Sequence, residues 1–467
     1  MLWILLACAR DPYRDWPDPE TVFPYVYTLE TDLEPYEEVR WETETWTLEE
    51  DPSTAALYLL KAGLHRPGAP VESLEHFEVM REAIPPVGEG IRLSFAGDVM
   101  WVGDNWAHFA DPAAGMLDGD LRIGNLETPT APGFPTEPDE LGLYHYNAPP
   151  EMLDGLPLDL LQLTNNHVLD VGDPGLEGTL AEVEARGYAS TGVDDPVTVE
   201  VAGQAVSVLA YTWGINDRGA TSTHDLHIVP FGHLDEDVDL SGIAAEIGAA
   251  RQAGVDQIVV LVHWGYEYEY YPDPHFMILG REIVALGADL VVGEGPHCVQ
   301  PPEICHVNDP YVIPGVGTCS VRTEDGVPRT AAIAYSLGDF GTTLETWPLK
   351  AGIVLTATLG EGGVTELGWA AEATVTRTNG PEVWPMEALV GEEPDAAVEL
   401  ARLGEHLGMG WARGAAATMD AYATSVRIGR ISEDVKAVVG DQAGCTVPLP
   451  FAGTPIPRHA PASVEAS

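Results

Sequence analysis

The sequence predicts an α/β domain in which strands buried on both faces alternate with amphipathic helices. From Ile91 onward, short runs rich in apolar and β-branched residues follow one another, as in residues 206–213 and 257–265. Helical patterns lie between these runs, and this alternation is typical of a sheet that is covered on both faces. The chain has 467 residues, which is enough for one such domain with extensions.

Seven apolar runs predict the strands of this domain. The strands are expected at 91–98, 121–127, 158–167, 206–213, 257–265, 289–297 and 331–340. Three amphipathic stretches predict helices at 175–187, 242–254 and 276–287. Each of these stretches ends on a glycine, the residue that most readily ends a helix. A further helix, rich in glutamate and alanine, is expected near 394–408.

The segments that flank the domain have a different character. Residues 21–89 mix two β-like pieces, 25–33 and 39–48, with a predicted helix near 53–63. The regular alternation fades after about Leu359, and the end of the chain is rich in proline. We therefore expect four parts: a leader and tether at 1–20, an N-terminal extension at 21–89, the α/β domain at 90–375, and a C-terminal extension with a flexible end at 376–467.

The first residues resemble the signal of a bacterial lipoprotein, in which a cysteine is lipidated after cleavage. The short apolar run ends at Leu5-Leu6-Ala7-Cys8, and an acidic, proline-rich stretch that suits a tether follows. The run is shorter than a usual signal and no basic residues precede it, so a chance hydrophobic start is the alternative. We expect a protein of the cell envelope, attached to the membrane only by lipid on Cys8, because no later segment has the apolar length of a membrane span.

The charge of the chain argues against some classes of partner. Lysine and arginine number 22 and the acidic residues 74, which gives a net charge of −52. Such a surface repels nucleic acid and anionic lipid headgroups, so nucleic-acid binding is not expected. It also disfavours polyanionic substrates unless a metal supplies local positive charge. We interpret the excess as a solvated acidic surface; binding of cations is the alternative.

The number of cysteines is compatible with disulfide bonds. If Cys8 is lipidated, an even number remains: Cys298, Cys305, Cys319 and Cys445. This number is compatible with disulfides in a protein outside the cytoplasm. The first three lie close together in the sequence at spacings that match no zinc motif, so we interpret them as structural. The sequence does not fix their pairing.

Six of the seven apolar runs end at residues that can bind a metal. These residues are Asp98, Asn125, Glu127, Asn165, Asn166, His167, His263, His297 and Asp339. The carboxyl ends of strands in an α/β sheet line a common crevice, so these side chains are candidates for one site. Any one of them alone would more commonly be a hydrogen-bonded polar group of the core. Together they form an oxygen and nitrogen set that suits Zn²⁺, Mn²⁺, Fe²⁺ or Mg²⁺.

The order and spacing of these motifs resemble the CapA family of poly-γ-glutamate capsule biosynthesis proteins, which are similar to calcineurin-like metallophosphoesterases. The motifs are Gly97-Asp98, Gly124-Asn125-Leu126-Glu127, Asn165-Asn166-His167 with Asp170 and Gly172, His263-Trp264-Gly265 with Glu267-Tyr268, Pro296-His297 with Gln300-Pro301, and Ser336-Leu337-Gly338-Asp339-Phe340. The resemblance covers residues 91–356. It implies a four-layer α/β/β/α sandwich with a metal site at one edge.

The resemblance also implies roles for individual residues. The metal ligands would be Asp98, Glu127, Asn166, His263 and His297. Glu127 would take the bridging place between two metals. His167 would contact the scissile group and protonate the leaving oxygen, and Asn165 and Asp170 are grouped with it as catalytic. Further candidates for the site are Glu294, Asp339, Asn125 and Glu267.

The sequence departs from the family pattern at two positions. Gly295 stands where the family usually has a histidine, and Asp339 stands where it usually has an asparagine. Met100 stands where the wider phosphoesterases have a histidine, a departure that the family shares. Because fewer protein ligands weaken metal binding, we expect one well-held metal and a second that is weak or absent. Glu294 lies next to the gap at Gly295 and could reach into it.

Taken together, these features predict a CapA-type protein of capsule or poly-γ-glutamate biosynthesis. Its site would be that of a metal-dependent, phosphoesterase-like hydrolase with one or two divalent metals, Mn, Zn, Fe or Mg. The substrate would be an anionic polymer or a phosphoester, and capsule synthases would be partners. The alternative, favoured by Gly295, is a non-catalytic envelope protein that uses the same fold to bind polymer or a partner synthase.

Overall fold

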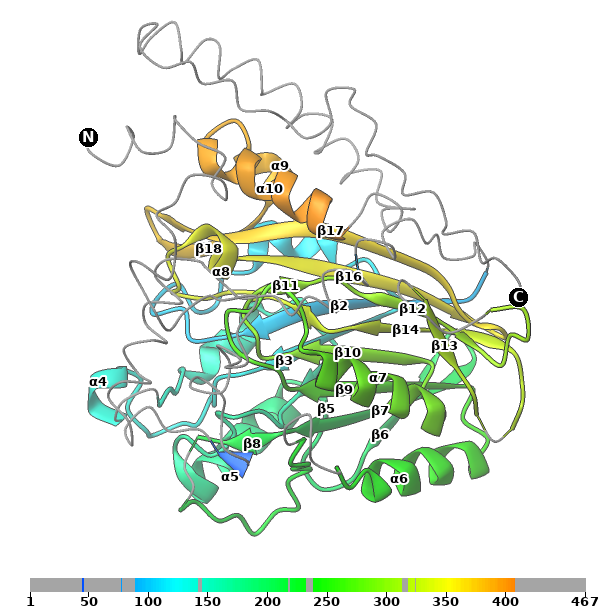
Figure 1. Cartoon of the computed structure of the whole chain (residues 1–467). Helices are drawn as coiled ribbons and strands as arrows, with labels where there is room; N and C mark the ends of the chain where they lie inside the picture. The colour runs from blue at the N-terminus through cyan, green and yellow to red at the C-terminus, as the bar shows by residue number, and fades with distance from the viewer. Residues whose placement is uncertain are drawn as a thin grey trace, which may run out of the picture.

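The computed structural model describes residues 44–45, 77, 89–141, 145–216, 219–231, 238–312, 318–323 and 325–407 (Figure 1). The predictions for Cys8, Cys445, the β-like piece at 25–33 and the helix at 53–63 lie outside these residues. Strand β1 (Glu44–Thr45) is the described part of the predicted piece at 39–48.

Most of the strands form one mixed sheet in the order β5-β4-β3-β2-β16-β17-β14-β10-β9-β7-β6. Their bounds are β2 Ile91–Val99, β3 Leu121–Leu126, β4 Leu160–Gln162, β5 Ala189–Thr191, β6 Val197–Val201, β7 Gln204–Thr212, β9 Gln257–His263, β10 Leu290–Glu294, β14 Arg329–Ala334, β16 Ala351–Gly360 and β17 Gly363–Arg377. Strands β12 (Glu303–Val307), β13 (Cys319–Val321) and β18 (Gly380–Pro385) extend it, while β8 (Gly214–Ile215) pairs with β1 and β11 (Val299–Gln300) pairs with β15 (Ser336–Leu337).

The sheet divides into two halves where β17 meets β14. The two strands pair only at Thr330 and Gly363, and a Cβ atom on Gly363 would lie 2.1 Å from the Thr330 carbonyl oxygen. Figure 1 shows β2, β16 and β17 on one side of this joint and β14, β10 and β9 on the other. Leu93 of β2 shares a core cluster with residues of β9 and β10, whereas Ala96 faces a second cluster. The first half is therefore buried on both faces.

The helices cover these strands as an α/β sheet requires. Their bounds are α4 Pro138–Leu141, α5 Gly172–Ala185, α6 Ser241–Gln252, α7 Pro274–Leu286, α8 Trp347–Lys350, α9 Met386–Leu389 and α10 Pro394–Leu407, with 3-10 helices η1 Asp111–Met116 and η2 Pro150–Gly155. The four helices predicted within the described ranges are confirmed as α5, α6, α7 and α10. Gly187, Gly254 and Gly287, which follow the first three, have positive φ, as expected for residues that end a helix. The predicted α/β fold is confirmed.

The C-terminal part of the described chain packs on the same sheet. The expected boundary at residue 375 falls inside β17, which pairs with β18 as far as Arg377. Helix α9 contacts both strands, and α10 contacts α8 and α9. Within the described ranges, no helix combines the length and the hydrophobicity that crossing a membrane requires.

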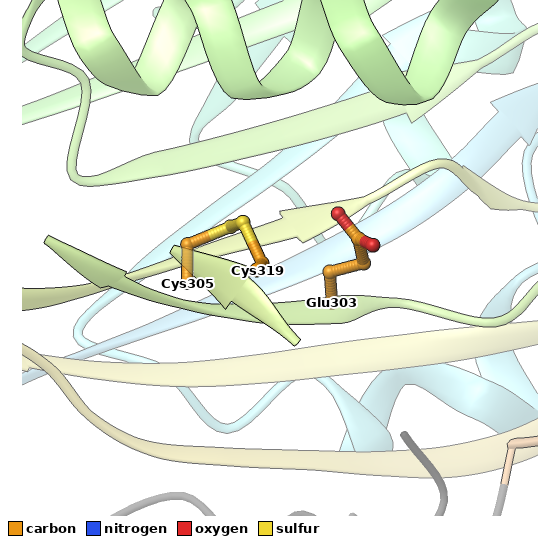
Figure 2. Close-up of side chains that lie close together, drawn as sticks. All are labelled: Glu303, Cys305 and Cys319. Atoms are coloured by element: carbon orange, nitrogen blue, oxygen red, sulfur yellow. A yellow bond between two sulfur atoms is a disulfide. The ribbon is translucent and has the colours of Figure 1, made fainter. Parts of the chain in front are cut away.

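A disulfide joins the two neighbouring strands that extend the sheet from β14. Cys305 of β12 and Cys319 of β13 are paired in register and bonded to each other (Figure 2). This confirms a structural role for these two cysteines and gives the pairing that the sequence left open. Cys298 is buried and keeps its thiol.

Candidate metal centre

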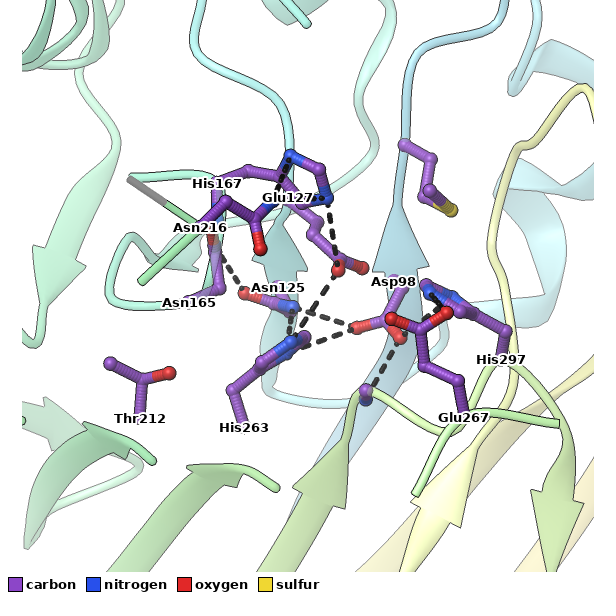
Figure 3. Close-up of polar contacts among 12 residues, drawn as sticks. Asp98, Asn125, Glu127, Asn165, His167, Thr212, Asn216, His263, Glu267 and His297 are labelled. Carbon is purple, nitrogen blue, oxygen red and sulfur yellow. Dashed lines mark hydrogen bonds and ion pairs between the residues drawn. The ribbon is translucent and has the colours of Figure 1, made fainter. Parts of the chain in front are cut away.

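The predicted strand ends meet in one buried centre. Asp98 comes from β2, Glu127 directly follows β3, His263 ends β9 and His297 lies just beyond β10 (Figure 3). Asp339 lies just beyond β15. None of these five side chains is more than 3% exposed. The carboxyl ends of the strands therefore bring together residues that are up to about 240 positions apart in sequence.

Asp98 occupies the middle of this centre. Its Oδ1 accepts a hydrogen bond from Asn125 Nδ2 at 2.7 Å, and its Oδ2 accepts one from the backbone N–H of Gly295 at 3.0 Å. The backbone of Asp98 is fixed as well, because its N–H donates to Gly338 and its carbonyl accepts from Phe340. Oδ1 of Asp98 is thus held on the side of Asn125, and Oδ2 on the side of Gly295.

Two groups of potential metal ligands share Asp98. In the first, His263 Nε2 lies 3.4 Å from Glu127 Oε1, and His263 Nδ1 lies 3.9 Å from Asp98 Oδ1. In the second, His297 Nδ1 lies 2.8 Å from Asp339 Oδ1 and 3.6 Å from Asp98 Oδ2. The ligand atoms within each group lie within 4.8 Å of one another. The residue common to both groups is Asp98, and not Glu127, to which the resemblance assigns the bridging place.

The donor set fits divalent cations. Both carboxylate oxygens of Glu127 and Oδ2 of Asp339 are buried and have no hydrogen-bond partner among the described residues. A buried carboxylate without a partner is costly, and a metal ion is one of the few groups that can offset the cost. Two carboxylates and one imidazole per group suit Mn²⁺, Mg²⁺, Fe²⁺ or Zn²⁺.

The electrostatics of the centre reflect this concentration of charge. Burial raises the pKa of Glu127 well above its usual range, and the neighbouring carboxylate of Asp98 raises it further. Burial also raises the pKa of Asp339 to about 6, although His297 opposes the shift. Burial and the nearby His297 lower the pKa of His263 well below its ordinary value. A neutral imidazole at His263 is the form that binds a metal.

His297 carries the opposite shift. Burial disfavours its charged form, but the carboxylates of Asp339 and Glu127 outweigh burial and raise its pKa well above the ordinary value. Its Nε2 faces Glu267 Oε2 at 3.8 Å, and burial raises the pKa of Glu267 to about 7. The backbone φ of His297 is +54°, a left-handed conformation that costs energy for a residue with a side chain. Such strain at a buried ligand-type residue is common at functional sites.

His167 stands beside the two groups and is oriented by Asp170. Its Nδ1 lies 2.6 Å from Asp170 Oδ2, while its Nε2 faces Glu127 Oε1 at 3.9 Å. The backbone N–H of Tyr146 donates to the same Asp170 oxygen, and the Tyr146 ring packs 5.1 Å from the imidazole. The arrangement holds the imidazole with Nδ1 toward its carboxylate and Nε2 toward the centre.

The three asparagines among the predicted residues have different surroundings. Asn165 donates to Asn125 Oδ1 and to the carbonyl of Leu126, and accepts from the backbone N–H of His167. It therefore braces the turn that carries His167. Asn125 donates to Asp98 and lies 3.2 Å from His263 Nδ1, so it supports two ligand candidates. Asn166 is buried with an unpartnered Oδ1, and its role as a ligand stays a prediction.

Two residues near the centre were missed by the sequence analysis. Asn216, just after β8, has its Nδ2 3.2 Å from His167 Nδ1 and an unpartnered Oδ1. Asn216 lies three residues beyond the apolar run at 206–213, so a search for polar residues that extended slightly past the carboxyl end of this run would have identified it. Glu372 of β17 is fully buried beside Asp339, with neither oxygen hydrogen-bonded to a described residue. No pattern in the sequence distinguishes the buried Glu372 from Glu366 of the same strand, which is only partly buried.

Comparison with known families gives a match to the same part of the chain. The family model described as "Bacterial capsule synthesis protein PGA_cap" matches residues 92–343, more than half of the 467 residues. The "PGA biosynthesis protein CapA" of Bacillus subtilis is 26% identical over 277 residues, which are 54% of this chain and 69% of that protein. The "Capsule biosynthesis protein CapA" of Bacillus anthracis is 29% identical over 205 residues, 41% of this chain and 47% of that protein.

Solved structures show a more distant likeness. A 5'-nucleotidase precursor from Thermus thermophilus has a TM-score of 0.36 and 13% sequence identity, over 68% of this chain and 58% of that one. A hypothetical protein from the same organism has a TM-score of 0.33 and 15% identity, over 63% of this chain and 99% of that one. At these TM-scores neither structure bears on the function of the centre.

Proposed function

The chain belongs to the bacterial capsule synthesis protein PGA_cap family, and we propose that it is a metal-dependent hydrolase of the phosphoesterase kind. The observation that carries the proposal is the pair of ligand groups that share Asp98. They offer adjacent places for two divalent cations in a buried site, with carboxylate oxygens that have no other described partner. Glu127 with His263 would hold one cation, and Asp339 with His297 would hold the other.

The chemistry follows from this pair of places and from His167. A divalent cation bound there would lower the pKa of a coordinated water to about 7 and would neutralise negative charge on a substrate oxygen. The carboxylate of Asp170 holds Nδ1 of His167, so Nε2 is the nitrogen left to hold a proton for the leaving group. Asn165 keeps the turn that carries His167 in place through the backbone N–H of that residue. These positions suit hydrolysis of a phosphoester.

The biological setting is proposed from the relatives and from the surface. Two relatives are named for the biosynthesis of capsule or PGA, and we propose that this chain acts in the same process on an anionic polymer or a phosphoester, with a capsule synthase as partner. A net charge of −52 repels such substrates, so the cations would also serve to attract them. The Cys305–Cys319 disulfide supports a place outside the cytoplasm, and a lipid on Cys8 would attach the protein to the cell envelope.

One observation favours a second function. Gly295 offers no side chain next to His263, so one position has fewer protein ligands than the family pattern implies. A centre that holds a metal too weakly for catalysis could still bind a polymer or a partner synthase through the same fold. Measurement of activity separates the two functions.

The test is hydrolysis of p-nitrophenyl phosphate and bis-p-nitrophenyl phosphate by the purified full chain with Mn²⁺, Mg²⁺ or Zn²⁺, paired with metal analysis. We expect bound metal and activity that His263→Ala and His297→Ala each abolish. A folded chain that takes up no transition metal and hydrolyses neither ester would refute the proposal. A chain that binds metal but hydrolyses neither ester nor poly-γ-glutamate would favour the binding function.

A further inference from the structure

We propose that Glu294 supplies the fourth protein ligand at the metal position formed by Asp98, Glu127 and His263. This inference rests on the proposed function, because it concerns the same centre, but it assigns a role to a residue outside both groups of ligands described above.

The register of the sheet directs Glu294 into the centre. Strands β9 and β10 are parallel, and Glu294 pairs directly with His263. Side chains at paired positions of neighbouring strands lie on the same face of the sheet. The imidazole of His263 points toward Glu127, so the side chain of Glu294 leaves the sheet on that same face. The backbone carbonyl of Glu294 accepts the N–H of Trp264 at 2.8 Å, which fixes this pairing at the strand ends.

One carboxylate oxygen of Glu294 is available to bind a metal. The side chain is 3% exposed, and its Oε2 is buried without a hydrogen-bond partner in the described part of the chain. The backbone N–H of Leu337 hydrogen-bonds to the carboxylate, which anchors one end of it. The charged groups that act on it most strongly are Asp98 and Glu127, the two carboxylates of this metal position. Three buried carboxylates that repel one another at the ends of neighbouring strands would be stabilised by a cation between them.

Gly295 prevents the usual alternative, a ligand from the next residue. A Cβ atom at this position would lie 3.2 Å from Nε2 of His263 and 3.0 Å from the carbonyl oxygen of Trp264. The φ angle of Gly295 is +108°, which residues with side chains rarely adopt. Its N–H is used to hold Oδ2 of Asp98. A side chain at 295 would therefore be crowded by His263 and strained in its backbone, and Glu294 is the adjacent residue placed to contribute a ligand atom.

This assignment changes the character of the metal position. Three carboxylates and one imidazole form a harder donor set than two carboxylates and one imidazole. Oxygen-rich sets favour Mn²⁺ or Mg²⁺, whereas sets richer in imidazole favour Zn²⁺. Mn²⁺ is therefore the probe for the test.

The experiment measures Mn²⁺ binding to the full chain by titration calorimetry, with stoichiometry checked by equilibrium dialysis. We expect two Mn²⁺ ions per chain in the unmodified protein. In Glu294→Gln, one of the two ions should bind about 10- to 100-fold more weakly. Glu372→Gln is the matched control, because Glu372 is also buried and its two carboxylate oxygens have no hydrogen-bond partner among the described residues, but it lies beside Asp339, at the other position. It should leave the Mn²⁺ ion at the Glu127 position unchanged.

The outcomes separate this inference from the proposed function. Two Mn²⁺ ions of unchanged affinity in Glu294→Gln would overturn the role of Glu294 and leave the hydrolase proposal standing. Absence of Mn²⁺ binding in the unmodified chain would overturn the role of Glu294. The hydrolase proposal would fall with it only if Mg²⁺ and Zn²⁺ also failed to bind and neither ester were hydrolysed. Circular dichroism in EDTA checks that Glu294→Gln folds. If it does not, Glu294→Asp, which keeps the charge but withdraws it by one methylene, should fold and bind the same ion more weakly; unchanged binding there would equally count against the inference.

Discussion

Two clusters of ligand-type residues lie in the same sheet, and their difference separates a metal site from a structural cluster. Glu303, Cys305 and Cys319 form one, and the residues around Asp98 form the other (Figures 2 and 3). Ligand atoms in both lie within 4.8 Å of one another, and both are buried. Residue type and proximity alone therefore do not distinguish them.

The difference lies in how the buried charge is neutralised. In the first cluster the two sulfurs are consumed by the disulfide, and Glu303 accepts hydrogen bonds from Arg281 Nε at 3.0 Å and from the Tyr335 hydroxyl at 2.9 Å. Around Asp98, no lysine or arginine contacts the carboxylates in the described structure, and several of their oxygens have no partner. His297 faces Asp339 and Asp98, but Glu127 keeps two unpartnered oxygens, so the charge of this centre is neutralised only in part and a cation would stabilise it.

The largest expected effect is the removal of the shared ligand. Asp98→Asn keeps the shape of the side chain but removes the charge that both ligand groups use, so both metals should be lost. We expect metal content by mass spectrometry near zero and hydrolysis of aryl phosphate reduced more than about 100-fold. Glu303→Gln is the control. This variant should have lower folding stability, because Arg281 loses its carboxylate partner, but its metal content should be unchanged. Equal loss of metal in both variants would erase the distinction between the clusters.

A smaller loss of activity is expected when proton transfer is removed and the metals are kept. His167→Gln should lower kcat by about 10²- to 10⁴-fold with unchanged metal content. The loss should be greater for an alkyl phosphate than for p-nitrophenyl phosphate, because a poor leaving group needs the proton more. Asp170→Asn should show the same dependence on the leaving group with a smaller loss. A loss that is the same for both kinds of ester would argue against His167 as the general acid.

The disulfide cluster should respond in stability and not in metal content. Cys305 and Cys319 are separated by 14 residues, and closing a loop of this size contributes about 3 kcal/mol to the free energy of unfolding. The double variant Cys305→Ser, Cys319→Ser should lose about this amount in urea unfolding while it binds Mn²⁺ as before. Dithiothreitol should destabilise the unmodified chain similarly and the double variant not at all. Loss of metal from the double variant would mean that the two clusters are coupled.

The sequence identified most residues of the centre but not how they contact one another. Asp98, Glu127, His263 and His297 were identifiable because parallel strands that alternate with helices deliver their carboxyl ends to one place. The central position of Asp98 could not be identified from the sequence. It depends on hydrogen bonds from the backbone N–H of Gly295 and from the side-chain amide of Asn125, and no motif encodes these contacts.

The C-terminal strands escaped prediction for a related reason. β16, β17 and β18 are antiparallel neighbours joined by short connections, so no helices alternate with them to mark their place in the sheet. Glu372 lies on one of them, next to Gly352 of β16, where a Cβ atom would be 2.3 Å from Glu372 Oε1. The need for a glycine there becomes visible only when both strands are in place. Likewise, the pairing of Cys305 with Cys319 follows from the register of β12 and β13.

The smallest expected effect is a dependence of stability on pH that the metal removes. In the metal-free fold, burial raises the pKa of Asp339 to about 6 and of Glu267 to about 7, whereas both titrate near 4 in an unfolded chain. At these two carboxyl groups the folded state therefore binds more protons than the unfolded state between about pH 4 and 7, and their contribution to stability falls as pH rises through that window. Thermal unfolding in EDTA should show a lower midpoint at pH 7.5 than at pH 5.

Two comparisons connect this dependence to the centre and not to the acidic surface as a whole. Asp339→Asn should reduce the fall by an amount on the order of 2 kcal/mol, because the amide does not titrate. Saturating Mn²⁺ should restore stability at pH 7.5 in the unmodified chain, since the cation then neutralises the carboxylates that the protons had neutralised. The cluster at Glu303 already has its arginine, so Glu303 should contribute nothing to the effect of Mn²⁺. A pH dependence of stability that neither Asp339→Asn nor Mn²⁺ alters would originate on the acidic surface. The buried carboxylates of the centre would then not differ from Glu303 in their effect on stability.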